Sequence, residues 1–252
     1  MARVHSKWIN GNLVFYDHAH RMRWVDAYGP NVIKWELPRC GGTLDDSTAY
    51  PTWGVCTVVD TGASSTLPTP GGTLGVGLQV LTAKGEYDGV VVQGHGEPFQ
   101  LTAGKPLYMG AKFETSDTSK CDLFIGLAET ETIIHAAAAH TLHASVDNYV
   151  GFWKPSDVAV MKCATEKASS ASVATTAGTM VNNAKHTVEV YYDGAASSAG
   201  LTYFFDGVQM VKKTTAANIP TVLMYPTFAF RTGAAAAKTG KLHWMRVIQL
   251  DT

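Results

Sequence analysis

Residues 185–194 read KHTVEVYYDG, and residues 201–210 read LTYFFDGVQM. In the first stretch, the apolar residues Val188, Val190 and Tyr192 alternate with Thr187 and Glu189. Successive side chains of a β-strand point to opposite faces of a sheet, so a period of two indicates a strand with one buried face. The first stretch therefore predicts a strand that lies over a hydrophobic core.

Both stretches contain the pair Asp-Gly, at positions 193–194 and 206–207. Asp tolerates the left-handed backbone region and Gly enters it without steric cost, which suits a tight turn. Asp206-Gly207 therefore predicts a hairpin between strands at Leu201–Phe205 and Val208–Lys212. The small residues 195–200 form the predicted loop to the preceding strand, so three antiparallel strands follow one another as a meander.

The same alternation, or a continuous apolar run, recurs along most of the chain. Further strands are predicted at Gly54–Asp60, Thr73–Thr82, Gly89–Gln93, Leu107–Glu114, Asp122–Ala128, Asn148–Trp153, Val158–Glu166, Val222–Arg231 and Lys241–Leu250. Thr130–His143, with four alanines at 136–139, is the one segment whose composition favours a helix. No helix falls between successive predicted strands, so a parallel sheet is not expected. The sequence predicts an all-β fold, an antiparallel β-sandwich.

Composition narrows the class of protein. A chain of 252 residues can bury a core without disulfides or metals, and its net charge of −1 lacks the basic surface that nucleic acids require. The four cysteines form no C-x-x-C pair, so reduced, buried thiols are expected instead of a zinc site. Neither a signal sequence nor a run of about 18 apolar residues occurs, so no membrane span is predicted. No cofactor is expected.

Residues 1–53 differ from the rest, and we predict two units: an N-terminal extension at 1–53 and a sandwich domain at 54–252. Asn10-Gly11 predicts a hairpin within the extension. Two interpretations of its aromatic side chains stay open. They cover the sandwich of their own chain, or some of them anchor a partner, because aromatic and Arg residues are enriched at interface centres. The candidate interface residues are Trp8, Phe15, Tyr16, Arg21, Arg23, Trp24, Tyr28 and Trp35.

The sequence contains no complete motif for catalysis or metal binding among those considered below. His135, His140 and His143 lack the spacing of a zinc helix, and we interpret them as part of a surface segment. Glu129 and Glu131 have the spacing of a strand pair, but they follow a strand end, so we interpret them as solvated turn residues. A Gly-x-Ser-x-Gly elbow, a phosphate-binding loop and the Glu-x-Asp-x-x-Glu pattern of sandwich β-glucanases do not occur. We therefore expect a protein that is not an enzyme and holds no metal.

Residues 98–250 resemble the concanavalin A-like jelly-roll sandwich. The resemblance is carried, in order, by YMGAKFE at 108–114, DLFIGL at 122–127, YVGF at 149–152, HTVEV at 186–190, YFFDG at 203–207 and LHWMRV at 242–247. Lectins, glycanases, adhesion modules and viral structural proteins share this fold. Within that group, the extension and the Ala/Thr/Gly-rich loops resemble the head decoration (cement) proteins of tailed bacteriophages.

The resemblance implies a non-enzymatic virion structural protein that is assembled in the host cytoplasm. Such a protein would bind the major capsid protein or another virion protein, and it would form homo-oligomers. The alternative is a carbohydrate-binding module or lectin, for example in a phage tail, with Trp153 or an aromatic residue of the extension stacked on a glycan. A glycan-cleaving enzyme is the third possibility.

Overall fold

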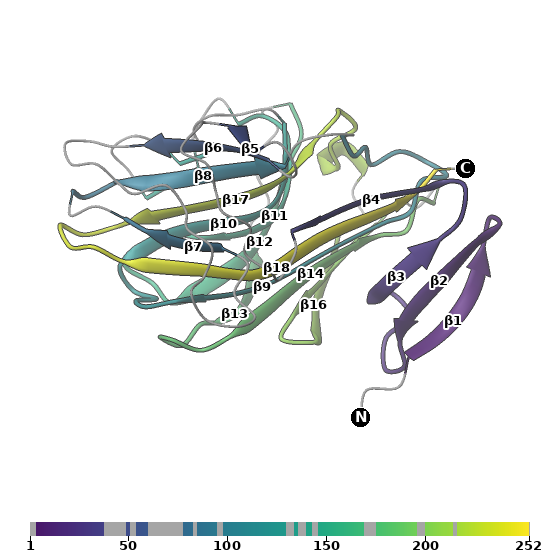
Figure 1. Cartoon of the computed structure of the whole chain (residues 1–252), viewed down its shortest axis with the longest axis horizontal. Coiled ribbons are helices and arrows are strands. Elements are labelled where there is room, and N and C mark those ends of the chain that lie inside the picture. The colour runs from purple at the N-terminus through teal and green to yellow at the C-terminus, as the bar shows by residue number, and fades with distance from the viewer. Residues whose placement is uncertain are drawn as a thin grey trace.

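The computed structural model describes residues 4–37, 49–50, 54–59, 78–82, 85–94, 98–129, 134–135, 140–142, 146–168, 175–195, 200–213 and 216–251. These residues form two large antiparallel sheets and one small sheet. Figure 1 shows the large sheets stacked as two layers, with the small sheet beside the end of β18 that lies near the C-terminus. The predicted antiparallel β-sandwich of the jelly-roll type is confirmed.

The eight-stranded sheet has the order β13-β12-β11-β10-β17-β8-β6-β5. Its strands are β5 (Ala49–Tyr50), β6 (Gly54–Val59), β8 (Gly89–Gly94), β10 (Cys121–Ala128), β11 (Tyr149–Lys154), β12 (Val160–Glu166), β13 (Thr175–Thr179) and β17 (Tyr225–Thr232). Every residue of β10 is buried, because its two faces meet different clusters. Leu123, Ile125 and Leu127 face the core between the sheets. Phe124 and Ala128 pack under Ile134 on the other side.

The seven-stranded sheet has the order β16-β15-β14-β9-β18-β4, with β7 paired to the first part of β18. Its strands are β4 (Val32–Leu37), β7 (Leu78–Leu81), β9 (Leu107–Thr115), β14 (His186–Tyr192), β15 (Leu201–Phe205), β16 (Val208–Lys213) and β18 (Thr239–Leu250). The predicted meander is β14-β15-β16, and Asp206 and Gly207 turn it with positive φ angles of 49° and 80°.

The core lies between the inner faces of the two large sheets. Met109 and Phe113 of β9 meet Phe152 and Phe230 of the other sheet within one cluster of buried residues. Burying an aliphatic or aromatic side chain of this size contributes about 1.5–3 kcal/mol. The free thiols of Cys121 and Cys163 are buried within this cluster, as predicted for these two cysteines.

The small sheet comes from residues 4–28 and has the order β1 (Val4–Ile9), β2 (Asn12–Asp17) and β3 (Trp24–Tyr28). Asn10 and Gly11 form the predicted hairpin turn, with φ angles of 48° and 76°. One face of the sheet packs on the outer face of the seven-stranded sheet. The two faces share one buried cluster, which contains Val14, Trp24, Ala27, Tyr108, Ile248 and Leu250.

β4 was assigned to the extension by the sequence analysis, but it lies in the sandwich. It pairs with β18 from Leu37↔Met245 to Val32↔Leu250. Trp35 packs against the main core. Part of the predicted extension therefore completes the seven-stranded sheet, and residues 4–28 alone form the separate small sheet.

The predicted helix at 130–143 is wrong for the residues that the structure describes there. His135 and Leu142 form an antiparallel β-bridge, so neither of these two residues is helical. Ile134 packs into the outer cluster of the eight-stranded sheet. Burial of this side chain outweighs the helix propensity of the neighbouring alanines. In the described part of the chain, no helix is long and apolar enough to cross a membrane.

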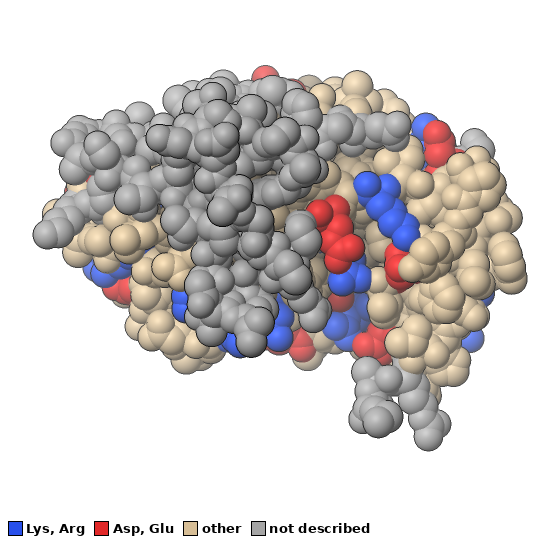
Figure 2. All heavy atoms as spheres, in the orientation of Figure 1, with Lys and Arg blue, Asp and Glu red and all other residues tan. Residues whose placement is uncertain are grey.

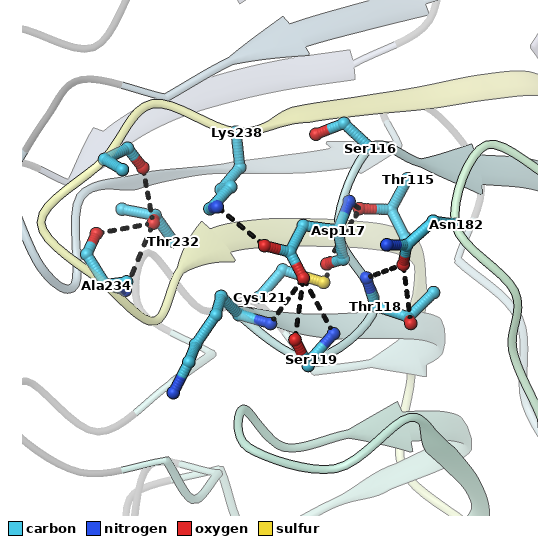
Figure 3. Close-up of polar contacts among 12 residues, drawn as sticks. Thr115, Ser116, Asp117, Thr118, Ser119, Cys121, Asn182, Thr232, Ala234 and Lys238 are labelled. Carbon is cyan, nitrogen blue, oxygen red and sulfur yellow. Dashed lines mark hydrogen bonds and ion pairs between the residues drawn. The ribbon is translucent and has the colours of Figure 1, made fainter.

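A polar network closes one end of the sandwich (Figure 3). Lys238, just before β18, donates to Asp117 Oδ2 at 2.7 Å, and the amide of Ser119 donates to Asp117 Oδ1 at 3.0 Å. Burial raises the pKa of Asp117, but the hydrogen bonds from Lys238 and Ser119 outweigh it and lower that pKa to about 2. The ionised carboxylate thus joins the β9–β10 turn to the β17–β18 turn.

We expect Asp117→Asn to lower the free energy of unfolding by about 1–2 kcal/mol at neutral pH, because charge-assisted hydrogen bonds are lost. The folded pKa is depressed, so the stabilisation is complete above the unfolded value of 3.8 and disappears as the pH falls to about 2. Urea titrations at neutral pH and across this range measure both effects. Asp157→Asn, which removes an exposed pair with Lys120, is the control and should change little. An Asp117→Asn protein with unchanged stability and acid sensitivity would contradict the assignment.

Candidate functional site

A cleft lies between the small sheet and the outer face of the seven-stranded sheet. Its volume is about 190 Å³, and we call it the outer-face cleft. The cleft is lined by Asp17, Arg23, Trp24, Val25, Tyr108, Glu189, Trp244 and Arg246. Figure 2 shows acidic and basic side chains gathered in a band on this side of the molecule. The lining combines indole rings, guanidinium groups, carboxylates and a phenol.

Strand register brings the cleft residues of the large sheet together. Gly110 of β9 pairs with Glu189 of β14 on one side and with Arg246 of β18 on the other. A Cβ atom at Gly110 would lie 2.5 Å from the Tyr108 hydroxyl and 3.2 Å from the Trp244 ring. The missing side chain therefore leaves room for these two aromatic groups between the two charged residues.

Glu189 and Arg23 connect the two sheets. Arg23 Nε donates to Glu189 Oε2 at 2.6 Å, and the Tyr108 hydroxyl donates to Glu189 Oε1 at 2.7 Å. Arg23 Nη1 also lies 3.3 Å from Asp17 Oδ2, on the small sheet. Both carboxylate oxygens of Glu189 thus have a donor, and Glu189 itself is buried.

Burial and charge fix the protonation states of this network. Burial and the neighbouring Glu189 carboxylate raise the pKa of Tyr108 well above its usual value, so its hydroxyl keeps its proton and remains a donor. Burial opposes the charged form of Arg23, but the hydrogen bond and the charge of Glu189 outweigh it and raise the pKa of Arg23. The network is therefore a charged pair with a neutral phenol at neutral pH.

Arg246 is held differently from Arg23. Its guanidinium stacks over the Trp244 ring, 5.0 Å from the ring centroid, and it donates to the carbonyl of Val25. Its carboxylate neighbour is Glu36, at 3.5 Å, and more than half of the Glu36 side chain is exposed. Arg246 Nε is buried without a hydrogen-bond partner among the described residues. The charge of Arg246 is thus less neutralised than that of Arg23.

The structure places two of the predicted interface residues, Arg23 and Trp24, in the cleft. Trp24 is fully buried against the sandwich, which agrees with the first interpretation of the extension. Trp8 and Tyr28 are 72% and 58% exposed, away from the buried face of the small sheet. Arg21 is exposed as well. The remaining three are partly buried: Phe15 touches Tyr28, Tyr16 packs at the small-sheet cluster, and Trp35 packs at the main core.

Sequence reasoning missed Tyr108, Glu189, Trp244 and Arg246 as site residues. The alternation of β9 and β14 places Tyr108 and Glu189 on the face opposite to core residues such as Met109. Alternation indicates which side of the sheet a residue faces, but it does not indicate which residues of neighbouring strands pair. Trp153, the other candidate for stacking on a sugar, packs at the outer cluster of the eight-stranded sheet, so it belongs to a different face.

The predicted surface histidines are not all at the surface. His135 is buried, and burial lowers its pKa to about 3, so its ring is neutral. His140 Nδ1 lies 3.1 Å from Asp122 Oδ2, and Arg231 donates to the same oxygen at 2.7 Å. His143 lies outside the described residues. In the part of the chain that the structure describes, no three His, Cys, Asp or Glu side chains could hold a metal ion together.

Glu129 differs from the solvated turn residue that was predicted. It accepts hydrogen bonds from the amides of Asp147 and Asn148, at 3.0 and 3.1 Å. The carboxylate thereby holds the start of β11 next to the end of β10. Glu131 lies outside the described residues.

Comparisons with known proteins support the fold. No family model and no curated protein matches the sequence. An endo-1,3-β-glucanase from Streptomyces sioyaensis is similar in structure, with a TM-score of 0.57, 10% identity, and coverage of 90% of this chain and 100% of that chain. The Emp46p carbohydrate recognition domain, in its potassium-bound form, is similar with a TM-score of 0.55 and 8% identity over 84% of this chain and 95% of that one.

The Emp47p carbohydrate recognition domain has a TM-score of 0.52 and 12% identity, over 84% of this chain and 94% of that chain. These likenesses assign the chain to the jelly-roll sandwich fold of lectins and glucanases, as the resemblance implied. None of the three structures is a virion protein.

We expect Glu189→Gln to loosen the small sheet, because Arg23 would lose its buried charge partner. Amide hydrogen exchange should accelerate in β2 and β3 while β10 stays protected, and the free energy of unfolding should fall by about 2 kcal/mol. Lys105→Met, which removes an exposed pair with Asp251 and does not touch the small sheet, is the control. Unchanged exchange across residues 12–28 in Glu189→Gln would show that apolar packing alone holds the small sheet.

Proposed function

We propose that this protein is a carbohydrate-binding, lectin-like module whose ligand occupies the outer-face cleft. The cleft itself is the observation that carries the proposal. It places an indole ring, Trp244, beside fixed charged groups in a hollow of about 190 Å³. A sugar offers C–H faces that stack on an aromatic ring and hydroxyl groups that exchange hydrogen bonds with charged side chains. Binding sites commonly combine an apolar surface with a few fixed polar groups in this way.

The state of the acidic residues favours binding without cleavage. Glycosidases of the common type need two carboxyl groups that act as acid and as base or nucleophile. In the cleft, Glu189 accepts from Arg23 and Tyr108, and Asp17 accepts from Arg23 and from the amide of Ala19. These carboxylates are engaged in holding the small sheet. We therefore keep the expectation that the protein is not an enzyme as part of the proposal.

The virion role, a capsid-protein partner and homo-oligomers stay predictions from the resemblance. They are compatible with a lectin-like module, since a virion can carry one in its tail. The lectin-like alternative is preferred here because it has a cleft of suitable chemistry and similar structures that are carbohydrate recognition domains.

We expect Trp244→Ala to weaken oligosaccharide binding at least tenfold, or by about 1.4 kcal/mol, because the stacking surface is lost. A glycan array identifies a ligand, and titration calorimetry compares the variants. Trp8→Ala is the matched control, since Trp8 is exposed on the other face of the small sheet and should not change the affinity. Loss of binding in Trp8→Ala with retention in Trp244→Ala would move the site to the extension and overturn the assignment to the cleft.

A further inference from the structure

We infer that the ligand of the outer-face cleft is an acidic sugar, whose carboxylate or sulfate group binds at Arg246 and Lys112 on either side of Trp244. This inference rests on the proposed carbohydrate-binding function and specifies the ligand class. Two observations support it. The carboxylates of the cleft are bonded to groups of the protein itself, and Lys112 pairs with Trp244 across β9 and β18.

The acidic side chains of the cleft are already engaged by donors of the protein itself. Arg23 Nη1 lies 3.3 Å from Asp17 Oδ2, and Arg23 Nε lies 2.6 Å from Glu189 Oε2. The Tyr108 hydroxyl donates a hydrogen bond to the other carboxylate oxygen, Glu189 Oε1. Each of the four carboxylate oxygens of Asp17 and Glu189 therefore accepts a hydrogen bond from within the protein, the last of them from the amide of Ala19. Glu114, further along β9, is likewise paired with Lys241 at 2.6 Å and with His243 at 3.1 Å.

Arg246 and Lys112 are the two cations beside Trp244 that take no part in the Arg23–Glu189 network. Arg246 meets Glu36 at 3.5 Å, at an exposed position where solvent weakens the attraction. Lys112 makes no ion pair within the described residues. Lys112 pairs with Trp244 across β9 and β18, and Gly110 pairs with Arg246 in the same two strands. Both cations therefore flank the indole on one face of the sheet.

An anionic group suits this arrangement better than a hydroxyl group does. A guanidinium binds a carboxylate or sulfate through charge-assisted hydrogen bonds, which are roughly twice as strong as neutral ones. A uronate or sulfated sugar carries that group at the edge of its ring. The ring can lie along Trp244 while the anionic group reaches a cation beside it. A neutral sugar would leave Lys112 without a counter-charge, and Arg246 with only its solvent-weakened contact to Glu36.

The experiment uses the full chain and three sets of oligosaccharides: neutral, uronate and sulfated. Within the uronate set, each oligomer is paired with its methyl ester, which keeps the sugar backbone and removes the charge. We expect binding to uronate or sulfated oligomers, with at least a tenfold loss on esterification or desulfation. Affinity should also fall as the salt concentration rises. The set that binds more tightly distinguishes a carboxylate from a sulfate.

Two variants locate the charge effect. Arg246→Gln and Lys112→Gln should each weaken binding of the acidic oligomer at least severalfold, and Lys112→Gln should leave binding of its ester nearly unchanged. Lys112→Gln is the safer test, since Arg246 also donates to the carbonyl of Val25. Arg21→Gln removes an exposed cation that does not line the cleft, so it should have no effect.

Equal or tighter binding of neutral oligomers and esters would overturn the acidic-sugar inference and leave the carbohydrate-binding proposal standing. Acidic binding that survives both Arg246→Gln and Lys112→Gln would overturn it as well, by placing the anion elsewhere. If no oligosaccharide of any set binds, the proposed function fails, and this inference fails with it.

Discussion

The ion pair between Arg23 and Glu189 joins residues that are 166 positions apart, and the outer-face cleft depends on it. The sandwich has its own core, so the small sheet is added to a surface that is already folded. Val14, Trp24 and Ala27 supply the apolar contact that holds the small sheet there. Apolar packing is not directional, whereas the 2.6 Å contact to the buried Glu189 fixes where the turn before β3 lies. That constraint sets the position of one wall of the cleft relative to the other.

Much of the sandwich could be predicted from the sequence. Alternation located β9 and β14, the Asp206-Gly207 signal located β15 and β16, and Asp206-Gly207 and Asn10-Gly11 form the turns expected of them. β13 was missed because it is an edge strand in which one residue, Ala177, is buried, so it has no apolar alternation to detect. The helix prediction at 130–143 followed alanine propensity, and the burial of Ile134 and His135 against the eight-stranded sheet outweighed it.

The cleft could not be predicted from the sequence, because its lining depends on how the strands pair. Alternation shows that Glu189 and Tyr108 face away from the core, but their partners depend on register. Glu189 and Arg246 lie level with each other on either side of β9, because each pairs with Gly110. No local sequence pattern specifies which residues of neighbouring strands pair. Of the aromatic and basic residues predicted as interface candidates in the extension, Arg23 and Trp24 line the cleft. β4, by contrast, was assigned to the extension because its pairing with β18 is also a matter of register.

The central claim is that the outer-face cleft binds sugar, and the indole N–H signals of the six tryptophans test it most directly. The measurement is a nitrogen-15 spectrum of the full chain during titration with the acidic oligosaccharide that binds best. The account predicts that the signals of Trp24 and Trp244 shift together and saturate at one concentration, while those of Trp8 and Trp153 stay in place. Shifts at Trp8 or Trp153, with Trp24 and Trp244 unmoved, would contradict it.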